Sequence, residues 1–212
     1  MAILNNKPTK RSINAQNTKS KLLATSISLF AQYGFDKVTV EDITNVAGLS
    51  KGTFYVYFKS KESILIEEFR MIDHQYETVM PTLPDTASGT ERILTLIKTM
   101  SRYCANDVGL PFMKIVYANQ IGAKENRILN DNTRSLYKFA HQSVQIGKDR
   151  GEFPDIPDDD FTELIIRWAR SILYDWCLYD GSFDLEAEAD KYFSILLSSL
   201  RALAVEQRRN SF

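Results

Sequence analysis

Apolar residues recur along most of the chain at the three- to four-residue spacing of an α-helix. In residues 18–33, for example, Leu23, Ile27, Phe30 and Ala31 fall on one helical face. No segment alternates apolar and polar residues between turn signals, as the strands of a hairpin do. The pattern therefore predicts an all-α fold.

The first part of the chain predicts three helices and the start of a fourth near Lys61. Gly34 is suited to end the first helix in a left-handed conformation, and Thr39 and Ser50 are typical N-cap residues for the next two. The three helices are expected at about residues 18–33, 40–47 and 51–58. Residues 1–16 are polar and show no helical period, so they predict a disordered basic arm. That arm either contacts phosphate groups through its cations or is a solvated tail.

Five further helices are expected after a break at Pro81–Gly89. Gly151 is placed to end the third of them, and Pro157 prevents its continuation. Asp158, Asp159 and Asp160 would supply a cap and favourable charge to the next helix. The expected ranges are about residues 90–106, 110–121, 124–150, 158–179 and 185–206.

Charge is divided unevenly between the two parts of the chain. Residues 1–61 hold nine Lys or Arg against three Asp or Glu, a net charge of +6. The remaining residues hold 17 against 24, a net charge of −7. A cationic segment joined to an acidic body indicates a polyanionic partner, such as DNA, at one end only.

Composition and motifs argue against several other classes of protein. No uncharged apolar run reaches the roughly 20 residues of a membrane span, and the N-terminus lacks the apolar core of a signal peptide, so we expect a cytoplasmic protein. Cys104 and Cys177 have no ligand or disulfide partner at a suitable spacing, which predicts packed thiols. His74 and His141 lack metal-ligand spacing, and no nucleophile elbow or phosphate-binding glycine loop is present. We therefore expect no catalytic residue, metal or cofactor.

Residues 40–58 predict a helix-turn-helix. Two short helices joined at Gly48-Leu49-Ser50 are too short to be stable alone, so they must be mounted on the first helix. The apolar residues expected to be buried there are Ile43, Val46, Leu49, Phe54 and Phe58. The residues left for solvent or DNA are Lys51, Thr53, Tyr55, Tyr57 and Lys59. The alternative is a helical interaction module that does not bind DNA.

The run from Thr39 to Glu62, TVEDITNVAGLSKGTFYVYFKSKE, resembles the DNA-binding signature of the TetR family of bacterial transcriptional regulators. The resemblance implies a repressor that binds a palindromic operator as a homodimer and is released by a small-molecule inducer, although activation stays open. It implies that Lys51, Gly52 and Thr53 face base edges, and that the phosphate contacts are Thr39, Tyr55, Tyr57 and Lys61, with Lys59 as a further candidate. Val56 stands where many relatives have an aromatic residue, which predicts one phosphate contact fewer.

The resemblance also implies the roles of the larger domain, so the expected organisation is the arm over 1–16, the DNA-binding domain over 17–61 and a ligand-binding and dimerisation domain over 62–212. The last two helices would form the dimer interface through Trp176, Leu196, Ser199, Leu200 and Leu203. Candidate inducer contacts are Met100, Tyr103, Cys104, Phe112, Met113, Tyr117, Arg167 and Trp168. Ordinary core packing is the alternative for the apolar members, and an ion pair with Glu163 is the alternative for Arg167.

Overall fold

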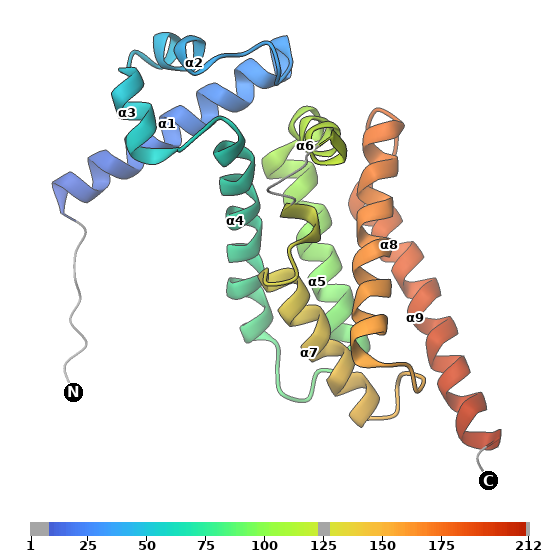
Figure 1. Cartoon of the computed structure of the whole chain (residues 1–212). Helices are drawn as coiled ribbons and strands as arrows, with labels where there is room; N and C mark the ends of the chain where they lie inside the picture. The colour runs from blue at the N-terminus through green and yellow to red at the C-terminus, as the bar shows by residue number, and fades with distance from the viewer. Residues whose placement is uncertain (1–8, 123–127, 211–212) are drawn as a thin grey trace, which may run out of the picture. The chain divides into compact units, whose positions relative to one another are not determined.

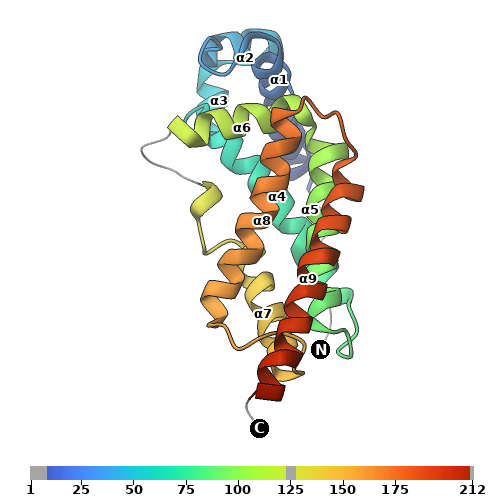
Figure 2. The same cartoon turned by 90° about the vertical axis from the view of Figure 1, so that its right-hand side faces the viewer.

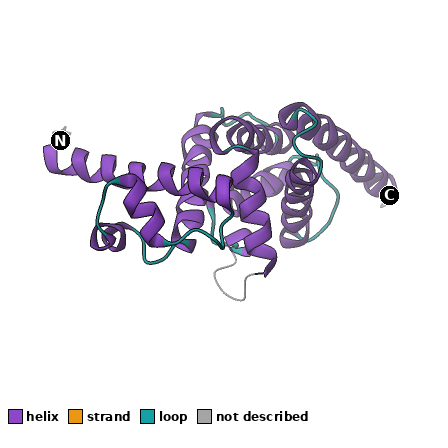
Figure 3. Cartoon of the chain, turned by 90° about the horizontal axis from the view of Figure 1, so that it is seen from above, coloured by secondary structure: helices purple, strands orange, loops and turns teal. Residues whose placement is uncertain are grey.

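The computed structural model of the protein describes residues 9–122 and 128–210, and its regular elements in these ranges are all helices (Figure 3). The all-α fold predicted from the apolar pattern is thus confirmed. None of the described helices combines the length and the apolar character needed to cross a membrane.

The chain divides into two compact units within α4, the first ending at Glu67 and the second beginning at Glu68 (Figure 1). The sequence had suggested a division after Lys61, before this helix. The first unit contains α1 (Lys10–Tyr33), α2 (Val40–Ala47), α3 (Lys51–Tyr57) and the start of α4 (Glu62–Val79). The second contains the rest of α4 with η1 (Met80–Thr82), α5 (Gly89–Tyr103), η2 (Cys104–Val108), α6 (Leu110–Gly122), η3 (Ile128–Asn130), α7 (Ser135–Asp149), α8 (Asp158–Leu178) and α9 (Leu185–Asn210).

The core of the first unit forms where α2 packs on both α1 and α3. Ile43, Phe54 and Phe58 are buried as predicted, whereas Leu49 is only half-buried. The expected burial of Val46 is wrong, because 66% of this residue is exposed. The inward face of α2 is completed by its neighbours Thr44 and Ala47, and Val46 lies to one side of that face.

The disordered arm expected over residues 1–16 is wrong for residues 10–16, which form the first turns of α1. Thr9 caps this helix, since its hydroxyl accepts a hydrogen bond from the Ser12 amide at 3.2 Å. The added turns are polar and largely exposed, so they carry no apolar period that the sequence could reveal. Lys7 and the rest of residues 1–8 lie outside the described residues.

The second unit is a helical bundle in which α5 packs against both α7 and α9. Helix α8 contacts both α7 and α9, and it also packs on α6 (Figure 2). Large side chains such as Leu96, Val144, Phe161 and Phe193 are buried where these helices meet. Cys104 and Cys177 are free and buried in the same unit.

The single helix expected over residues 124–150 is wrong, because α7 begins only at Ser135. The Asp131 carboxylate accepts hydrogen bonds from the Thr133 amide at 3.0 Å and from its hydroxyl at 2.6 Å. Such local bonds favour a turn over a helix. Arg134 then adopts an extended conformation, with a ψ of 151°, and α7 starts after it.

The three aspartates form the first turn of α8 and do not provide the predicted cap. Pro157 occupies the N-cap position, and no side chain caps the helix there. Asp158 instead accepts a hydrogen bond from Lys148 at 2.6 Å, which lowers the pKa of its carboxyl group. The negative charges still lie at the positive end of the helix dipole, as expected.

The start of α5 is stabilised from the turn that follows α7. The buried Glu152 carboxylate accepts hydrogen bonds from the amides of Gly89 at 3.1 Å and Thr90 at 3.0 Å. Arg150 donates to the carbonyls of Asp85, Thr86 and Ala87. Two turns that lie far apart in the sequence therefore depend on each other.

Candidate functional site

The exposed face of α3 brings together most of the residues predicted to contact DNA. Lys51, Gly52 and Lys59 are exposed, as is Tyr55, which is 56% exposed and therefore not part of the core. Thr53 and Tyr57 are half-buried at the edges of this face. Phe54 and Phe58 point inward and anchor the helix, with ring centroids 5.6 Å apart.

Gly52 is not required by packing within the chain. An added Cβ would meet only the Ser50 hydroxyl oxygen, at the ordinary contact distance of 3.6 Å. A glycine inside a helix nevertheless costs roughly 1 kcal/mol relative to alanine. The bare backbone at this exposed position is suited to close approach by an external molecule.

Lys51 is held by an ion pair with Glu41 of α2, with Nζ and Oε2 2.7 Å apart. The hydrogen bond to Glu41 raises the pKa of Lys51, which keeps its ammonium protonated. Both side chains are more than half exposed, so solvent screens the attraction. The ion pair orients Lys51, but an incoming anion or nucleic-acid base can replace Glu41 as its partner.

Thr39 is exposed and caps α2 in a capping box. Its hydroxyl accepts from the Asp42 amide at 3.1 Å, and its own amide donates to the Asp42 carboxylate at 2.8 Å. The bonds from Thr39 lower the pKa of Asp42. Thr39 thus fixes the first turn of α2 at the surface of the first unit.

Lys61 differs from the other predicted contacts because its ammonium is engaged by backbone. It donates hydrogen bonds to the carbonyls of Phe35 at 2.7 Å, Val38 at 3.2 Å and Asp36 at 3.4 Å. It also lies 4.4 Å from the centroid of the Phe35 ring. The structure does not present this ammonium to solvent as it does Lys51.

A small apolar cavity lies between α4, the π-helical turn η2 and α6. It encloses about 10 Å³, room for at most one water molecule, so a ligand of ordinary size requires its walls to move. Three of the predicted ligand contacts line it, and the sequence missed the contribution of α4. Its lining residues are Glu68, Phe69, Ile72, Cys104, Val108, Phe112 and Met113.

The other predicted ligand contacts are divided between core and surface. Met100 and Tyr103 are buried, and the Tyr103 hydroxyl donates to the Glu68 carboxylate at 3.4 Å. Tyr117 is also buried, and burial raises the pKa of its hydroxyl. Arg167 and Trp168 are wrong as interior contacts, because both are exposed. Arg167 forms its ion pair with Glu163 at 3.2 Å, and Trp168 lies on the outer face of α8.

Tyr76 of α4 is fully buried, and its hydroxyl has no hydrogen-bond partner in the part of the chain that the structure describes. Tyr76→Phe should therefore raise the free energy of unfolding by about 1 kcal/mol, because it removes a buried polar group that gains nothing from the fold. The matched control is Tyr117→Phe, whose lost hydroxyl donates to the Arg170 carbonyl at 2.9 Å, and it should be destabilising by about 1 kcal/mol. Urea denaturation measures the free energy of unfolding of both variants. An equal loss of stability in the two would contradict the conclusion that the Tyr76 hydroxyl has no hydrogen-bond partner.

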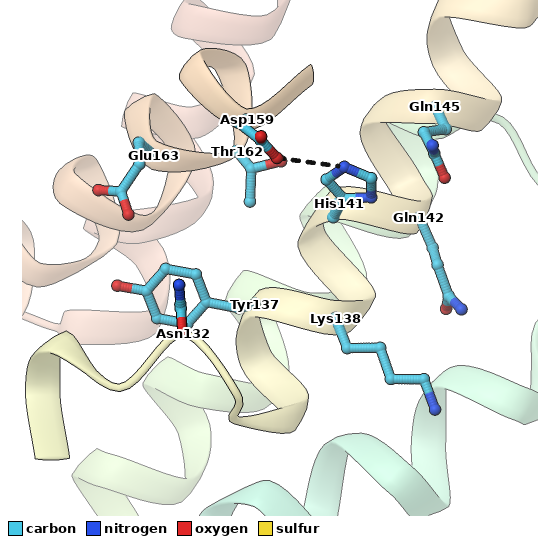
Figure 4. A pocket seen from close by; sticks show the side chains of 9 residues that line it. All are labelled: Asn132, Tyr137, Lys138, His141, Gln142, Gln145, Asp159, Thr162 and Glu163. Atoms are coloured by element: carbon cyan, nitrogen blue, oxygen red, sulfur yellow. Dashed lines mark ion pairs between the residues drawn. The ribbon is translucent and has the colours of Figure 1, made fainter. Parts of the chain in front are cut away.

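A wider polar hollow of about 580 Å³ lies between α7 and the start of α8 (Figure 4). His141 and Asp159 face each other across it at 3.5 Å. Its two buried polar groups are satisfied by the chain: the Tyr137 hydroxyl accepts from Arg170, and the Thr162 hydroxyl donates to the Asp158 carbonyl at 2.7 Å. No buried polar group there requires a ligand, so the hollow is explained as a solvated groove.

The outer face of α8 and α9 carries large apolar residues in contact with solvent. Of the predicted interface residues, Ser199 and Leu203 are exposed and Leu196 is half-buried. Trp176 and Leu200 are wrong, because both are buried in the core of their own unit, on the inward faces of the two helices. The other large apolar residues that are exposed on these two helices include Trp168, Tyr174, Leu178, Tyr192 and Ile195.

The chain is similar to known proteins in both sequence and structure. Residues 22–67 match the model of the bacterial regulatory proteins of the tetR family. The chain is 22% identical to the fatty acid metabolism regulator protein of Bacillus subtilis over 189 residues, which cover 85% of this chain and 94% of that protein. It is 25% identical to the HTH-type transcriptional regulator AcrR of Shigella flexneri over 195 residues, 86% of this chain and 89% of AcrR.

Among solved structures, the Bacillus subtilis transcriptional regulator FadR in complex with stearoyl-CoA is similar with a TM-score of 0.70 and 20% sequence identity. The match covers 84% of this chain and 97% of that chain. At this identity the likeness shows a shared fold. The fold extends over both units of the chain, whereas the family model covers the first unit from the middle of α1 onward.

Proposed function

The chain belongs to the TetR family of bacterial transcriptional regulators, and on this premise we propose that it is a ligand-responsive repressor. In this proposal a homodimer binds a palindromic DNA operator through α3 and is released when a small molecule enters the second unit. The observation that carries the proposal is the exposed face of α3, where Lys51, Gly52 and Tyr55 stand together on a helix anchored by buried phenylalanines.

The chemistry of this face supports a contact with duplex DNA. Lys51 and the hydroxyl of Thr53 are groups that bond to base edges in the major groove, and Gly52 allows the backbone to approach. Tyr55, Tyr57 and Lys59 are suited to phosphate oxygens at its margins. Thr39, at the start of α2, is proposed as a further phosphate contact. Together they would fix α3 in a groove.

A second copy of the chain is the proposed partner for the outer face of α8 and α9. Ile195, Ser199 and Leu203 recur on this face of α9 at helical spacing, and α8, which packs against α9, carries exposed apolar residues of its own. Two-fold pairing there would present two copies of α3 to successive major grooves, roughly 34–36 Å apart. The operator is therefore proposed to be palindromic.

The cavity between α4, η2 and α6 is the proposed inducer site. Its lining is almost wholly apolar, which favours a hydrophobic ligand, and the structurally similar FadR of Bacillus subtilis is in complex with stearoyl-CoA. Because the cavity has room for at most one water molecule, a ligand must prefer a conformation in which its walls have moved apart. Phe69 and Ile72 belong to α4, the helix that continues into the first unit, so α4 is the proposed lever.

Selection of genomic fragments with the purified protein tests the proposal. It should recover a palindromic site, for which Lys51→Ala lowers the affinity by roughly tenfold to a hundredfold and relaxes the preference at one base pair in each half-site. The matched control is Lys98→Ala, which removes another exposed lysine that faces a glutamate, Glu186, at 3.6 Å. It should leave operator affinity unchanged.

Failure to enrich any duplex at low salt would favour the alternative of a helical interaction module that does not bind DNA. Recovery of an operator whose occupancy raises transcription would make the protein an activator. The proposal assigns no catalytic role to any residue, and it places the protein in the cytoplasm, where its operator would lie.

A further inference from the structure

Lys61, the residue before α4, closes the link between α1 and α2 within the first unit. An ammonium group has three N–H donors, and the carbonyls of Phe35, Asp36 and Val38 provide three acceptors at 2.7–3.4 Å. The Phe35 ring adds a cation–π contact, with Nζ 4.4 Å from its centroid. The ammonium is therefore surrounded by groups of its own chain.

The link that Lys61 holds is itself fixed at both ends. Gly34 ends α1 with a positive φ of 86°, and its amide donates to the Phe30 carbonyl at 2.9 Å. The Phe35 ring packs on the buried Phe30, with centroids 4.8 Å apart, and Val38 is buried. This arrangement holds the link carbonyls within reach of the Lys61 ammonium.

We propose that Lys61 is a positioning residue, which holds Thr39 and the first turn of α2 in place and does not itself bind a DNA phosphate. This inference rests on the proposed DNA-binding function, and it replaces the phosphate contact that the family resemblance implies for Lys61. To reach a phosphate, the ammonium would have to leave three charge-assisted hydrogen bonds and the Phe35 ring.

The effect of Lys61 reaches the proposed DNA-binding face through Val38. The Val38 carbonyl accepts from Lys61, and the next residue, Thr39, caps α2 through Asp42. Without the ammonium, three carbonyls of the link lose their donor, and the link can move together with the capped end of α2. The complex with DNA would then lose the proposed contact between the neutral Thr39 and a phosphate. It would lose no contact between a charged side chain and a phosphate.

The experiment compares Lys61→Met with Lys59→Met, its exposed neighbour two residues earlier, in the full-length protein bound to the selected operator. Lys61→Met should weaken binding about tenfold and leave unchanged the slope of log affinity against log salt. Lys59→Met should reduce that slope by about 0.9, the value for one lost phosphate neutralisation. Hydrogen exchange in the free protein should become faster at the amides of residues 35–39 in Lys61→Met alone.

A double-mutant cycle with Thr39→Ala separates positioning from general stabilisation. Thr39→Ala should weaken operator binding in the wild-type background and have little further effect in Lys61→Met. If Lys61→Met does not fold, Phe35→Leu removes the contacts of the ring with Lys61 and with Phe30 but leaves the three hydrogen bonds of Lys61 in place, and it should show the same changes to a smaller degree.

Two results would overturn the inference while the proposed function stands. One is a slope that falls by about 0.9 in Lys61→Met with exchange unchanged, which would make Lys61 a phosphate contact. The other is additivity with Thr39→Ala, which would make Lys61 a residue of general stability. A wild-type protein that binds no duplex would instead overturn the proposed function and this inference together.

Discussion

Replacing Arg134 by methionine should lower the free energy of unfolding of the second unit by about 3–5 kcal/mol. The Arg134 guanidinium donates two parallel hydrogen bonds to Asp73, both of 2.9 Å, and lies 4.7 Å from the centroid of the Phe69 ring. The two charged side chains are only 6% and 14% exposed. Methionine preserves much of the apolar length of arginine but leaves the Asp73 carboxylate enclosed without this partner.

The matched control for Arg134→Met is Arg167→Met, which breaks an arginine–carboxylate pair on the surface of the same unit. Arg167 lies 3.2 Å from Glu163, and its side chain is 75% exposed, so the loss should stay below about 1 kcal/mol. Urea denaturation followed by circular dichroism measures both variants. Removal of the acid as well, in Arg134→Met with Asp73→Leu, should recover much of the loss. Similar small losses in the two single variants would show that the Asp73 pair is effectively solvated.

Gly89→Ala should lower the free energy of unfolding by about 3 kcal/mol, the upper part of the range for overpacked sites. A Cβ on residue 89 would lie 2.5 Å from the Gly147 Cα, 2.7 Å from its nitrogen and 2.7 Å from the Ser143 carbonyl oxygen. These are backbone atoms of α7, which cannot turn aside as a side chain can. The start of α5 must move away and weaken its bonds to Glu152. The melting temperature should fall by about 6–12 °C.

Gly52→Ala is the control for Gly89→Ala, since both glycines lie in the first turn of a helix. With only the Ser50 hydroxyl oxygen near its new Cβ, Gly52→Ala should be neutral or stabilise the first unit by up to about 1 kcal/mol. Under the proposed function it should also weaken operator binding, so stability and binding change in opposite directions. If Gly89→Ala had the same melting temperature as the wild type, α5 and α7 would be able to move apart without a loss of stability.

Helix type and order were predictable because local residues determine them. Thr39, Gly48 and Ser50 are capping and turn residues, and the structure places α2 at Val40–Ala47 between them, as predicted. The start of α1 was missed because its first turns are polar, and only the Thr9 cap indicates them. The helix expected over 124–150 failed because the bonds that Asp131 makes with Thr133 compete with helix formation in a way that periodicity does not report.

Exposure on α3 was predictable because Phe54 and Phe58 identify its inward face, which leaves Lys51 and Tyr55 outside. The environment of Lys61 was not predictable from the sequence, because its acceptors are backbone carbonyls 23–26 residues earlier. Every residue type has such a carbonyl, so the residue types there give no signal. Trp176 was assigned to the wrong side of α8 because a helix that is apolar on several faces does not reveal which face meets its own core.

The dependence of α5 on Glu152 has a consequence for synthesis on the ribosome. The acceptor of the Gly89 amide lies 63 residues later in the chain, a stretch that takes roughly 3–13 s to translate at about 5–20 residues per second. During that interval the N-terminus of α5 lacks the Glu152 carboxylate that accepts its hydrogen bonds. The whole sequence of the first unit, which ends at Glu67, has already been made. Translation therefore gives the first unit, which is proposed to bind DNA, time to fold before the helical bundle of the second unit can be completed.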